Sequence, residues 1–224
     1  MFLPFKTIIT NKKSHANYVF YICKSFLNLK QLPIMKNLII VGHPDINSFC
    51  YSGIFKTITQ ELSKNNEEIE VIDLYRDDFT RPRAKIIKKY QDLVTWSERM
   101  YFISPVWWFR LTPRMEIFFD EVFVPGFAYQ FVNITKLYAY PKPFLNNKIV
   151  RTYVTHGAPA LPVLTLYLNS VKLRLVMGVY TFVFGWRLSL FTKTKQFWSV
   201  PFVSDKKRTK YLKSVEKDIK TDLK

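Results

Sequence analysis

Apolar and polar residues alternate along most of the chain in a pattern that predicts strands and helices in turn. Residues 36–42 form a short, continuous apolar run ending at a glycine, which is typical of a buried parallel strand. Residues 50–64 carry apolar side chains at helical spacing, and residues 69–74 alternate as a second strand does. The pattern predicts further strands at 100–106, 149–155 and 180–184, and further helices at 84–96, 113–123, 161–177 and 205–222. This repeated alternation predicts a parallel sheet covered by helices on both faces.

The first 34 residues do not follow this pattern. They contain five lysines, no acidic residue and no arginine, and their apolar run Tyr18–Phe26 is too short to span a bilayer. No small-residue cleavage site follows the run, as a signal peptide would require. We therefore expect residues 1–34 to be a basic leader or extension outside the core, with Met35 as an alternative start. Residues 35–224 are expected to form the folded domain, in the cytoplasm.

The chain carries 34 Lys and Arg against 17 Asp and Glu, a formal charge of +17. Residues 1–34 contribute +5, residues 192–224 contribute +6, and the long middle section 35–191 contributes the remaining +6. Since no dense basic run is interleaved with aromatic residues, the charge indicates a solvated surface and small anionic ligands, with no nucleic-acid partner.

The scarcity of three residue types excludes several kinds of site. Two cysteines are too few for a disulfide scaffold, and with three histidines they leave little for a zinc site, so no metal is expected. The six glycines form neither a GxGxxG nor a GxxxxGK[ST] motif.

Ligands of parallel sheets bind beyond the carboxyl ends of the strands, so the loops at 42–50, 104–112 and 155–160 are the candidate sites. In the first loop, His43, Asn47 and Ser48 precede a helix, whose free N–H groups favour an anion. An ordinary capped helix with a structural histidine is the alternative interpretation of this loop.

The second loop carries three consecutive aromatic residues, Trp107, Trp108 and Phe109, which suit a flat ring ligand. Alternatively, they pack under a helix or in an oligomer interface. The third loop, Thr155-His156-Gly157, offers a hydroxyl, an imidazole and a glycine, and is weak evidence by itself. No Ser–His–Asp order or paired carboxylates identify a catalytic residue.

Four segments give residues 36–212 a resemblance to the flavodoxin-like NAD(P)H:quinone oxidoreductases, the group of DT-diaphorase, modulator of drug activity B and potassium-efflux ancillary proteins. These segments are LIIVGHPDINSF at 38–49, Asp-Leu-Tyr at 73–75, SPVWWFRLTPRMEIFFDEVFVPGFAYQF at 104–131, and Ser-Asp-Lys-Lys-Arg before the last helix. The resemblance implies a three-layer α/β sandwich of the flavodoxin-like type, with a five-stranded parallel sheet of order 2-1-3-4-5, and a homodimer.

The resemblance also implies a bound flavin, FAD or FMN, which is reduced by NAD(P)H and passes a hydride to a quinone or similar acceptor. Residues matching the family's flavin-binding segments are His43, Asn47, Ser48, Phe49, Cys50, Pro105, Val106, Trp107, Trp108, Phe109, Thr155, His156 and Gly157. The sequence departs from the family at Thr-His-Gly, often Thr-Gly-Gly, and lacks the Tyr and His that assist hydride transfer in the diaphorase branch. The alternative is therefore a flavin-binding regulatory subunit of a membrane transporter, and only this alternative implies membrane association.

Overall fold

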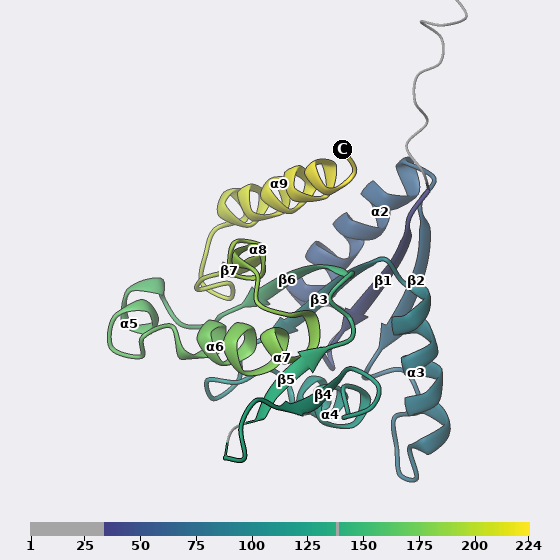
Figure 1. Cartoon of the computed structure of the whole chain (residues 1–224). Helices are drawn as coiled ribbons and strands as arrows, with labels where there is room; N and C mark the ends of the chain where they lie inside the picture. The colour runs from purple at the N-terminus through teal and green to yellow at the C-terminus, as the bar shows by residue number, and fades with distance from the viewer. Residues whose placement is uncertain (1–33, 138) are drawn as a thin grey trace, which may run out of the picture. The chain divides into compact units, whose positions relative to one another are not determined.

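A five-stranded parallel sheet organises the chain over residues 34–137 and 139–224, which the computed structural model describes (Figure 1). The strand order is β2-β1-β3-β6-β7. The strands are β1 (Lys36–Val41), β2 (Glu68–Asp73), β3 (Arg99–Pro105), β6 (Ile149–Thr155) and β7 (Thr194–Phe197). The predicted leader, residues 1–34, lies outside the described residues except for Ile34.

The apolar run at the start of the domain forms the centre of this sheet. β1 pairs in parallel with β2 on one side and with β3 on the other. Leu38 and Ile40 pack into the core on one face, whereas Ile39 and Val41 pack into the core on the opposite face. All four side chains are fully buried, which explains why the strand reads as a continuous apolar run.

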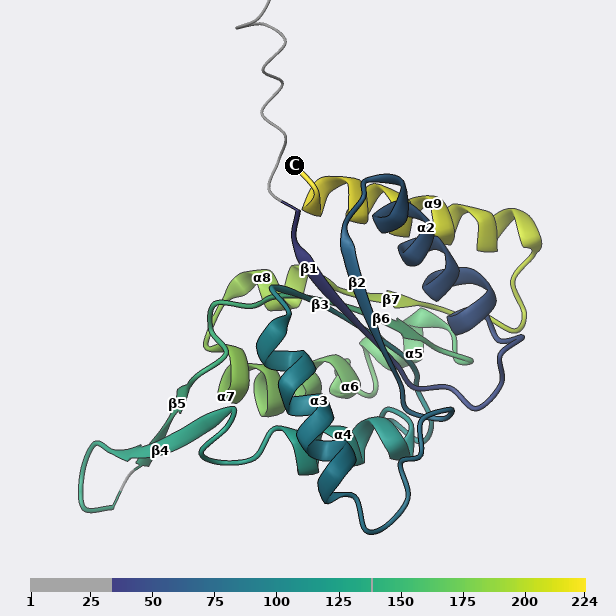
Figure 2. The ribbon, with the colours of Figure 1, turned by 90° about the vertical axis from the view of Figure 1, so that its right-hand side faces the viewer.

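Helices cover both faces of the sheet (Figure 2). One face packs against η1 (Phe49–Phe55), a π-helical segment, and against α2 (Lys56–Lys64) and α9 (Asp205–Asp222). The other face packs against α3 (Ala84–Trp96), α4 (Pro113–Val122), α6 (Ser170–Leu173), η2 (Arg174–Tyr180) and α7 (Thr181–Phe184). Two short helices, α5 (Ala160–Leu164) and α8 (Leu188–Thr192), complete the described part of the chain. Among these helices, none has both the length and the apolar character needed to cross a membrane.

Five parallel strands with helices on both faces agree with the sequence-based expectation, but the strand order differs in its numbering from 2-1-3-4-5. An antiparallel hairpin of β4 (Tyr129–Asn133) and β5 (Ala139–Pro143) is inserted between α4 and β6, and the sequence analysis missed it. Most side chains of the hairpin are exposed, so its sequence lacks the apolar alternation of a half-buried strand.

The strand predicted at Tyr180–Phe184 is wrong, because this segment ends η2 and forms α7. Its buried residues, Tyr180, Val183 and Phe184, follow the three-and-four spacing of a helix. The fifth strand is instead β7, at the edge of the sheet, whose central residues are polar and therefore gave no apolar signal. The helix predicted over 161–177 is interrupted, because α5 ends at Leu164 and a turn separates it from α6. In this turn Leu168 and Asn169 have positive φ angles of 49° and 52°, which a helix cannot adopt.

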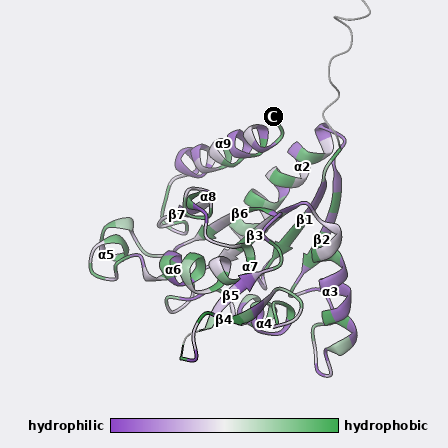
Figure 3. Cartoon of the chain, in the orientation of Figure 1, coloured by the Kyte–Doolittle hydropathy of each residue, from purple (hydrophilic) through white to green (hydrophobic). Residues whose placement is uncertain are grey.

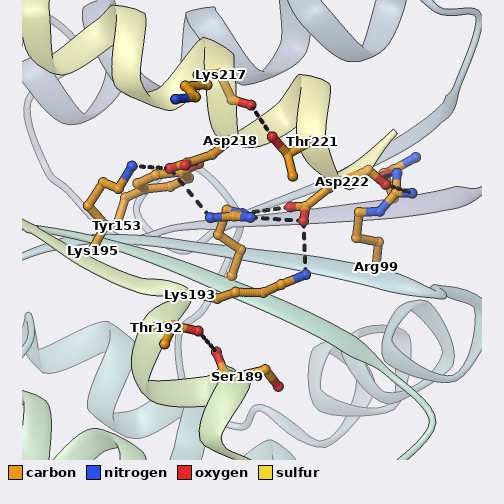
Figure 4. A network of polar contacts seen from close by, with 12 residues as sticks. Arg99, Tyr153, Ser189, Thr192, Lys193, Lys195, Lys217, Asp218, Thr221 and Asp222 are labelled. Atoms are coloured by element: carbon orange, nitrogen blue, oxygen red, sulfur yellow. Dashed lines mark hydrogen bonds and ion pairs between the residues drawn. The ribbon is translucent and has the colours of Figure 1, made fainter. Parts of the chain in front are cut away.

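A network of charged side chains fastens α9 to the sheet (Figure 4). Arg151 of β6 donates to Asp222 from Nε over 2.6 Å and from Nη2 over 2.8 Å. Lys193 donates to the same carboxylate over 2.9 Å, and Lys195 of β7 lies 2.5 Å from Asp218. Much of the rest of α9 is hydrophilic and faces solvent (Figure 3), so these ion pairs add to a small apolar contact around Val215.

Candidate functional site

A cavity of about 530 Å³ lies where the loops after β1, β3 and β6 meet. Its size falls within the range of ~300–1,000 Å³ typical of small-molecule sites, and its place is the ligand-binding edge of a parallel sheet. The predicted site residues that line it are His43, Asn47, Ser48, Phe49, Cys50, Pro105, Val106, Trp107, Thr155, His156 and Gly157. The structure thus brings together residues from three loops, the first and last of which are more than a hundred positions apart in the sequence.

Gly42 allows the first loop to leave β1 close to the start of α4. The Thr112 hydroxyl donates to the Gly42 carbonyl oxygen over 3.0 Å, and a Cβ at position 42 would lie only 3.0 Å from that hydroxyl oxygen. The Gly42 N–H donates to the Ile103 carbonyl over 2.9 Å. A side chain at this position would therefore push the loop away from the cavity edge.

Hydrogen bonds fix the tautomer of His43 in this loop. The Asp45 N–H donates to Nδ1 of His43 over 2.9 Å, so Nδ1 is unprotonated and Nε2 carries the hydrogen in the neutral ring. Burial lowers the pKa of His43, which favours this neutral form. Arg76, which does not line the cavity, donates over 2.7 Å to the carbonyl oxygens of both His43 and Pro44, and so holds the loop in place.

Ser48 precedes the helix formed by η1 and α2, where the alternative interpretation of this loop places a side-chain cap. Its hydroxyl makes no capping hydrogen bond. The Oγ atom is buried and has no hydrogen-bond partner in the part of the chain that the structure describes. A buried hydroxyl without a partner costs free energy, so Ser48 offers a donor and acceptor to a ligand in the cavity.

Two further residues of the cavity wall are uncharged although their side chains can ionise. The Cys50 thiol lies 3.4 Å from the Thr155 hydroxyl, and burial raises its pKa to about 12. The His156 ring stacks on Trp198 with 4.2 Å between centroids, and burial lowers the pKa of His156 to about 4. At neutral pH the inner wall of the cavity therefore presents a thiol and a neutral imidazole.

The aromatic loop after β3 divides into two parts. Trp107 lines the cavity, whereas Trp108 and Phe109 do not. A tight turn closes between Trp107 and Arg110, with both residues in between at positive φ, 51° for Trp108 and 57° for Phe109. Trp108 is 92% exposed, and Phe109 packs against Tyr167 at a tilt of 38°, with 4.3 Å between ring centroids.

Five lining residues were missed by sequence reasoning: Asp45, Ser52, Val200, Pro201 and Arg208. Among these five residues Arg208, on α9, is the one that carries a positive charge. Its guanidinium donates to the Val200 carbonyl over 3.2 Å from Nη2 and lies 3.2 Å from Asp205. The only sequence signal was the Ser-Asp-Lys-Lys-Arg segment before the last helix, and the position of that helix beside the first loop comes from the fold.

Comparisons with known proteins agree with this geometry. The model of the family described as flavodoxin-like fold matches residues 35–164, more than half of the chain. The chain belongs to this family. The expected resemblance to flavodoxin-like NAD(P)H:quinone oxidoreductases is thereby confirmed at the level of the family.

Among curated relatives, this flavodoxin-like chain is 30% identical over 95 residues to an uncharacterized NAD(P)H oxidoreductase, YdeQ, of Bacillus subtilis; the match covers 42% of this chain and 45% of the relative. The chain spans about half the length of the curated relatives it matches.

Solved structures show the same fold. Smu.1420 from Streptococcus mutans has a TM-score of 0.71 and 27% identity, over 84% of this chain and 100% of that one. An NAD(P)H:quinone oxidoreductase from Methanothermobacter marburgensis has a TM-score of 0.63 and 19% identity, over 83% and 98%. An FMN-dependent NADH-azoreductase from Bacillus anthracis, in complex with FMN, has a TM-score of 0.65 and 15% identity, over 85% and 100%.

Proposed function

We propose that this protein is a flavin-dependent NAD(P)H oxidoreductase that binds FMN in the cavity and transfers a hydride to a quinone or similar acceptor. The observation that carries the proposal is the convergence of Ser48, His43 and Arg208 on one cavity at the carboxyl ends of the central strands. The names of the curated relative, an NAD(P)H oxidoreductase, and of two similar structures, an NAD(P)H:quinone oxidoreductase and an FMN-dependent NADH-azoreductase, support the same class of reaction.

The groups beside the first loop fit a phosphate. Ser48 Oγ is buried without a partner, and it stands at the start of the helix through η1 and α2, where backbone N–H groups face outward. His43 adds a neutral N–H donor, and Arg208 adds a positive charge at the cavity wall. A monoester phosphate needs this combination of hydrogen-bond donors and positive charge.

Other lining groups of the same cavity fit a flat ring. Trp107, Val106 and Phe49 supply apolar surface, and Gly157 leaves space, since a Cβ there would meet no atom within 4 Å. The bound flavin supplies the hydride chemistry, while the protein holds the ring and shields it from water. Because Cys50 and His156 are both uncharged at neutral pH, the chain offers no charge from them to the ring.

The absorption spectrum of the purified full chain, before and after incubation with FMN or FAD, tests this proposal. We expect tight binding of FMN, bleaching of the flavin band by NADH or NADPH without oxygen, and recovery of the band when a quinone is added. A chain that binds neither flavin contradicts the cofactor assignment. A chain whose reduced flavin is not reoxidised by quinone contradicts the acceptor assignment and supports a regulatory role.

We further propose that a second copy of the chain covers the apolar surface beside the cavity. Trp108, Leu166, Leu168 and Tyr167 are all about half exposed or more, and Tyr167 contacts the loop that lines the cavity. Exposed apolar groups gathered on one side of a protein are typical of an interface. Light scattering is expected to give the mass of a dimer, and a monomeric mass at micromolar concentration contradicts this part of the proposal.

A further inference from the structure

Two side-chain amides, those of Gln196 and Asn169, hold the ring of His156. Nε2 of His156 lies 2.9 Å from Oε1 of Gln196 on β7. The amide nitrogen of Gln196 in turn donates to Oδ1 of Asn169 over 3.0 Å. Because the Gln196 amide nitrogen is used by Asn169, its oxygen faces His156 and accepts a hydrogen bond from the ring.

These two hydrogen bonds decide which nitrogen of the His156 ring carries the hydrogen. Nε2 must donate, so in the neutral ring Nδ1 is unprotonated and can only accept. Nδ1 makes no hydrogen bond with the described residues. Fully buried side-chain atoms without a partner, such as Ser48 Oγ, do occur among these residues, but Nδ1 of His156 is not one of them, so it is in contact with open space. Since the ring is otherwise almost fully buried and lines the cavity, Nδ1 faces the space that a ligand fills.

The surroundings keep this acceptor neutral and in place. The ring stacks on Trp198, and the backbone on both sides is fixed by the His156 N–H to Phe197 carbonyl bond of 2.7 Å and the Val200 N–H to His156 carbonyl bond of 2.9 Å. The titratable groups that share the cavity wall are His43, Asp45, Cys50 and Arg208, and none of them is hydrogen-bonded to the His156 ring.

We propose that His156 is a cofactor-recognition residue whose Nδ1 accepts a hydrogen bond from the N3–H group of the flavin ring, and that Gln196 and Asn169 are positioning residues that fix the accepting tautomer. The inference rests on the proposed function, because it concerns the same cavity and cofactor. N3–H is the one N–H group of the oxidised isoalloxazine ring, so a fixed acceptor selects the ring by its single donor edge. A lone pair there also discriminates against ring ligands that present a carbonyl at the same place.

The test is a thermodynamic cycle between the protein and the ligand, measured by fluorescence titration of the full chain with FMN and with N3-methyl-FMN. For the unmodified protein we expect N3-methylation to weaken binding on the order of five-fold, about 1 kcal/mol, the free energy of one neutral hydrogen bond. In His156→Ala this penalty is expected to disappear, because the acceptor is gone. A methylation penalty that is the same in both proteins overturns the proposal.

His43→Ala is the matched control, since His43 lines the same cavity but its Nδ1 already accepts from the Asp45 N–H. It is expected to keep the full methylation penalty. A protein that binds neither FMN nor its methyl derivative contradicts the proposed function itself, whereas FMN binding that is indifferent to N3-methylation contradicts only the role of His156.

Gln196→Glu tests the positioning role of Gln196 through the pH dependence of the methylation penalty, which a merely structural residue would not change. A carboxylate at this place accepts from Nε2–H and stabilises the doubly protonated ring, so it raises the pKa of His156. We then expect the methylation penalty to vanish as the pH falls from 8 to 5 in Gln196→Glu, and to stay constant over that range in the unmodified protein. A penalty independent of pH in the variant overturns the positioning role of Gln196.

Discussion

Replacing Asp222 by asparagine is expected to remove much of the stability of the domain. The Asp222 carboxylate is 2% exposed and receives three hydrogen bonds, two from Arg151 and one from Lys193 (Figure 4). The Arg151 side chain is itself only 6% exposed. Asparagine keeps the shape of the side chain but leaves the buried guanidinium with Asp218, 3.4 Å from Nη1, as its remaining counter-charge.

The magnitude follows from this burial. Removing one partner of a buried ion pair costs ~3–5 kcal/mol when the remaining desolvated charge is uncompensated. Because Asp218 still lies 3.4 Å from Arg151, we expect a loss at the lower end of this range, ~3 kcal/mol. This is a large part of the ~5–15 kcal/mol that holds a domain of ordinary stability together. We expect urea denaturation, followed by circular dichroism, to show a loss of this size in Asp222→Asn with an unchanged slope against denaturant.

Asp92→Asn is the matched control. Asp92 pairs with Lys88 over 2.7 Å on α3, but both side chains are more than half exposed. An exposed pair at this helical spacing contributes only ~0.3–0.5 kcal/mol. A loss in Asp222→Asn no larger than in Asp92→Asn would refute the conclusion that the network at α9 is shielded from water.

The pH dependence gives the same test a second readout. Burial acts to raise the pKa of Asp222, but the hydrogen bonds from Arg151 and Lys193 outweigh it, and the pKa is lowered. A carboxyl group with a lowered pKa in the folded state stabilises the fold above its unfolded pKa of ~3.9, and this stabilisation is lost as the pH falls through the folded value. The difference in stability between the unmodified protein and Asp222→Asn is therefore expected to shrink below about pH 4. A difference that stays constant down to pH 2 would contradict the assignment.

Three further substitutions probe the site. Arg208→Ala is expected to weaken FMN binding on the order of ten-fold and to leave riboflavin binding unchanged, since the guanidinium serves the phosphate; equal losses for both ligands would contradict this. Trp108→Gly is expected to leave FMN binding unchanged, because Trp108 lies outside the cavity, and to shift the light-scattering mass towards the monomer, because it removes the most exposed ring of the proposed dimer surface; an unchanged mass would contradict the role of Trp108 in that surface. Gly42→Ala is expected to cost ~1–3 kcal/mol in urea denaturation, because its Cβ meets Thr112 and Met115, and an unchanged midpoint would mean that the loop can shift freely.

Much of the sheet could be predicted from the sequence because its inner strands are buried on both faces. The run from Leu38 to Val41 reads as a buried strand whatever lies around it, and the fourth predicted strand, 149–155, coincides with β6. The edge strand β7 could not be found in this way. Lys195 and Gln196 are polar there because one pairs with Asp218 and the other with His156, and such partners are known only once α9 and the third loop are in place.

The candidate site was likewise predicted only where local sequence order decides the position of a residue. Rules for loops that follow parallel strands identified His43, Ser48 and His156 from sequence, since local order decides which residues stand at a strand's carboxyl end. The turn that places Trp108 and Phe109 outside the cavity depends on two positive φ angles, and nothing in a run of three aromatic residues indicates them.

The sequence by itself therefore determined the class of fold and the loops that line the cavity, because these follow from local periodicity and chain order. The tertiary structure alone decided that Arg208, some 160 residues after the first loop, reaches the same cavity, and that Gln196 sets the tautomer of His156. Both depend on tertiary contacts: β7 pairs with β6 at the edge of the sheet, and α9 packs on the sheet through buried charges such as Arg151 and Asp222. Interactions of this kind join residues without any regular spacing, so only the folded chain reveals them.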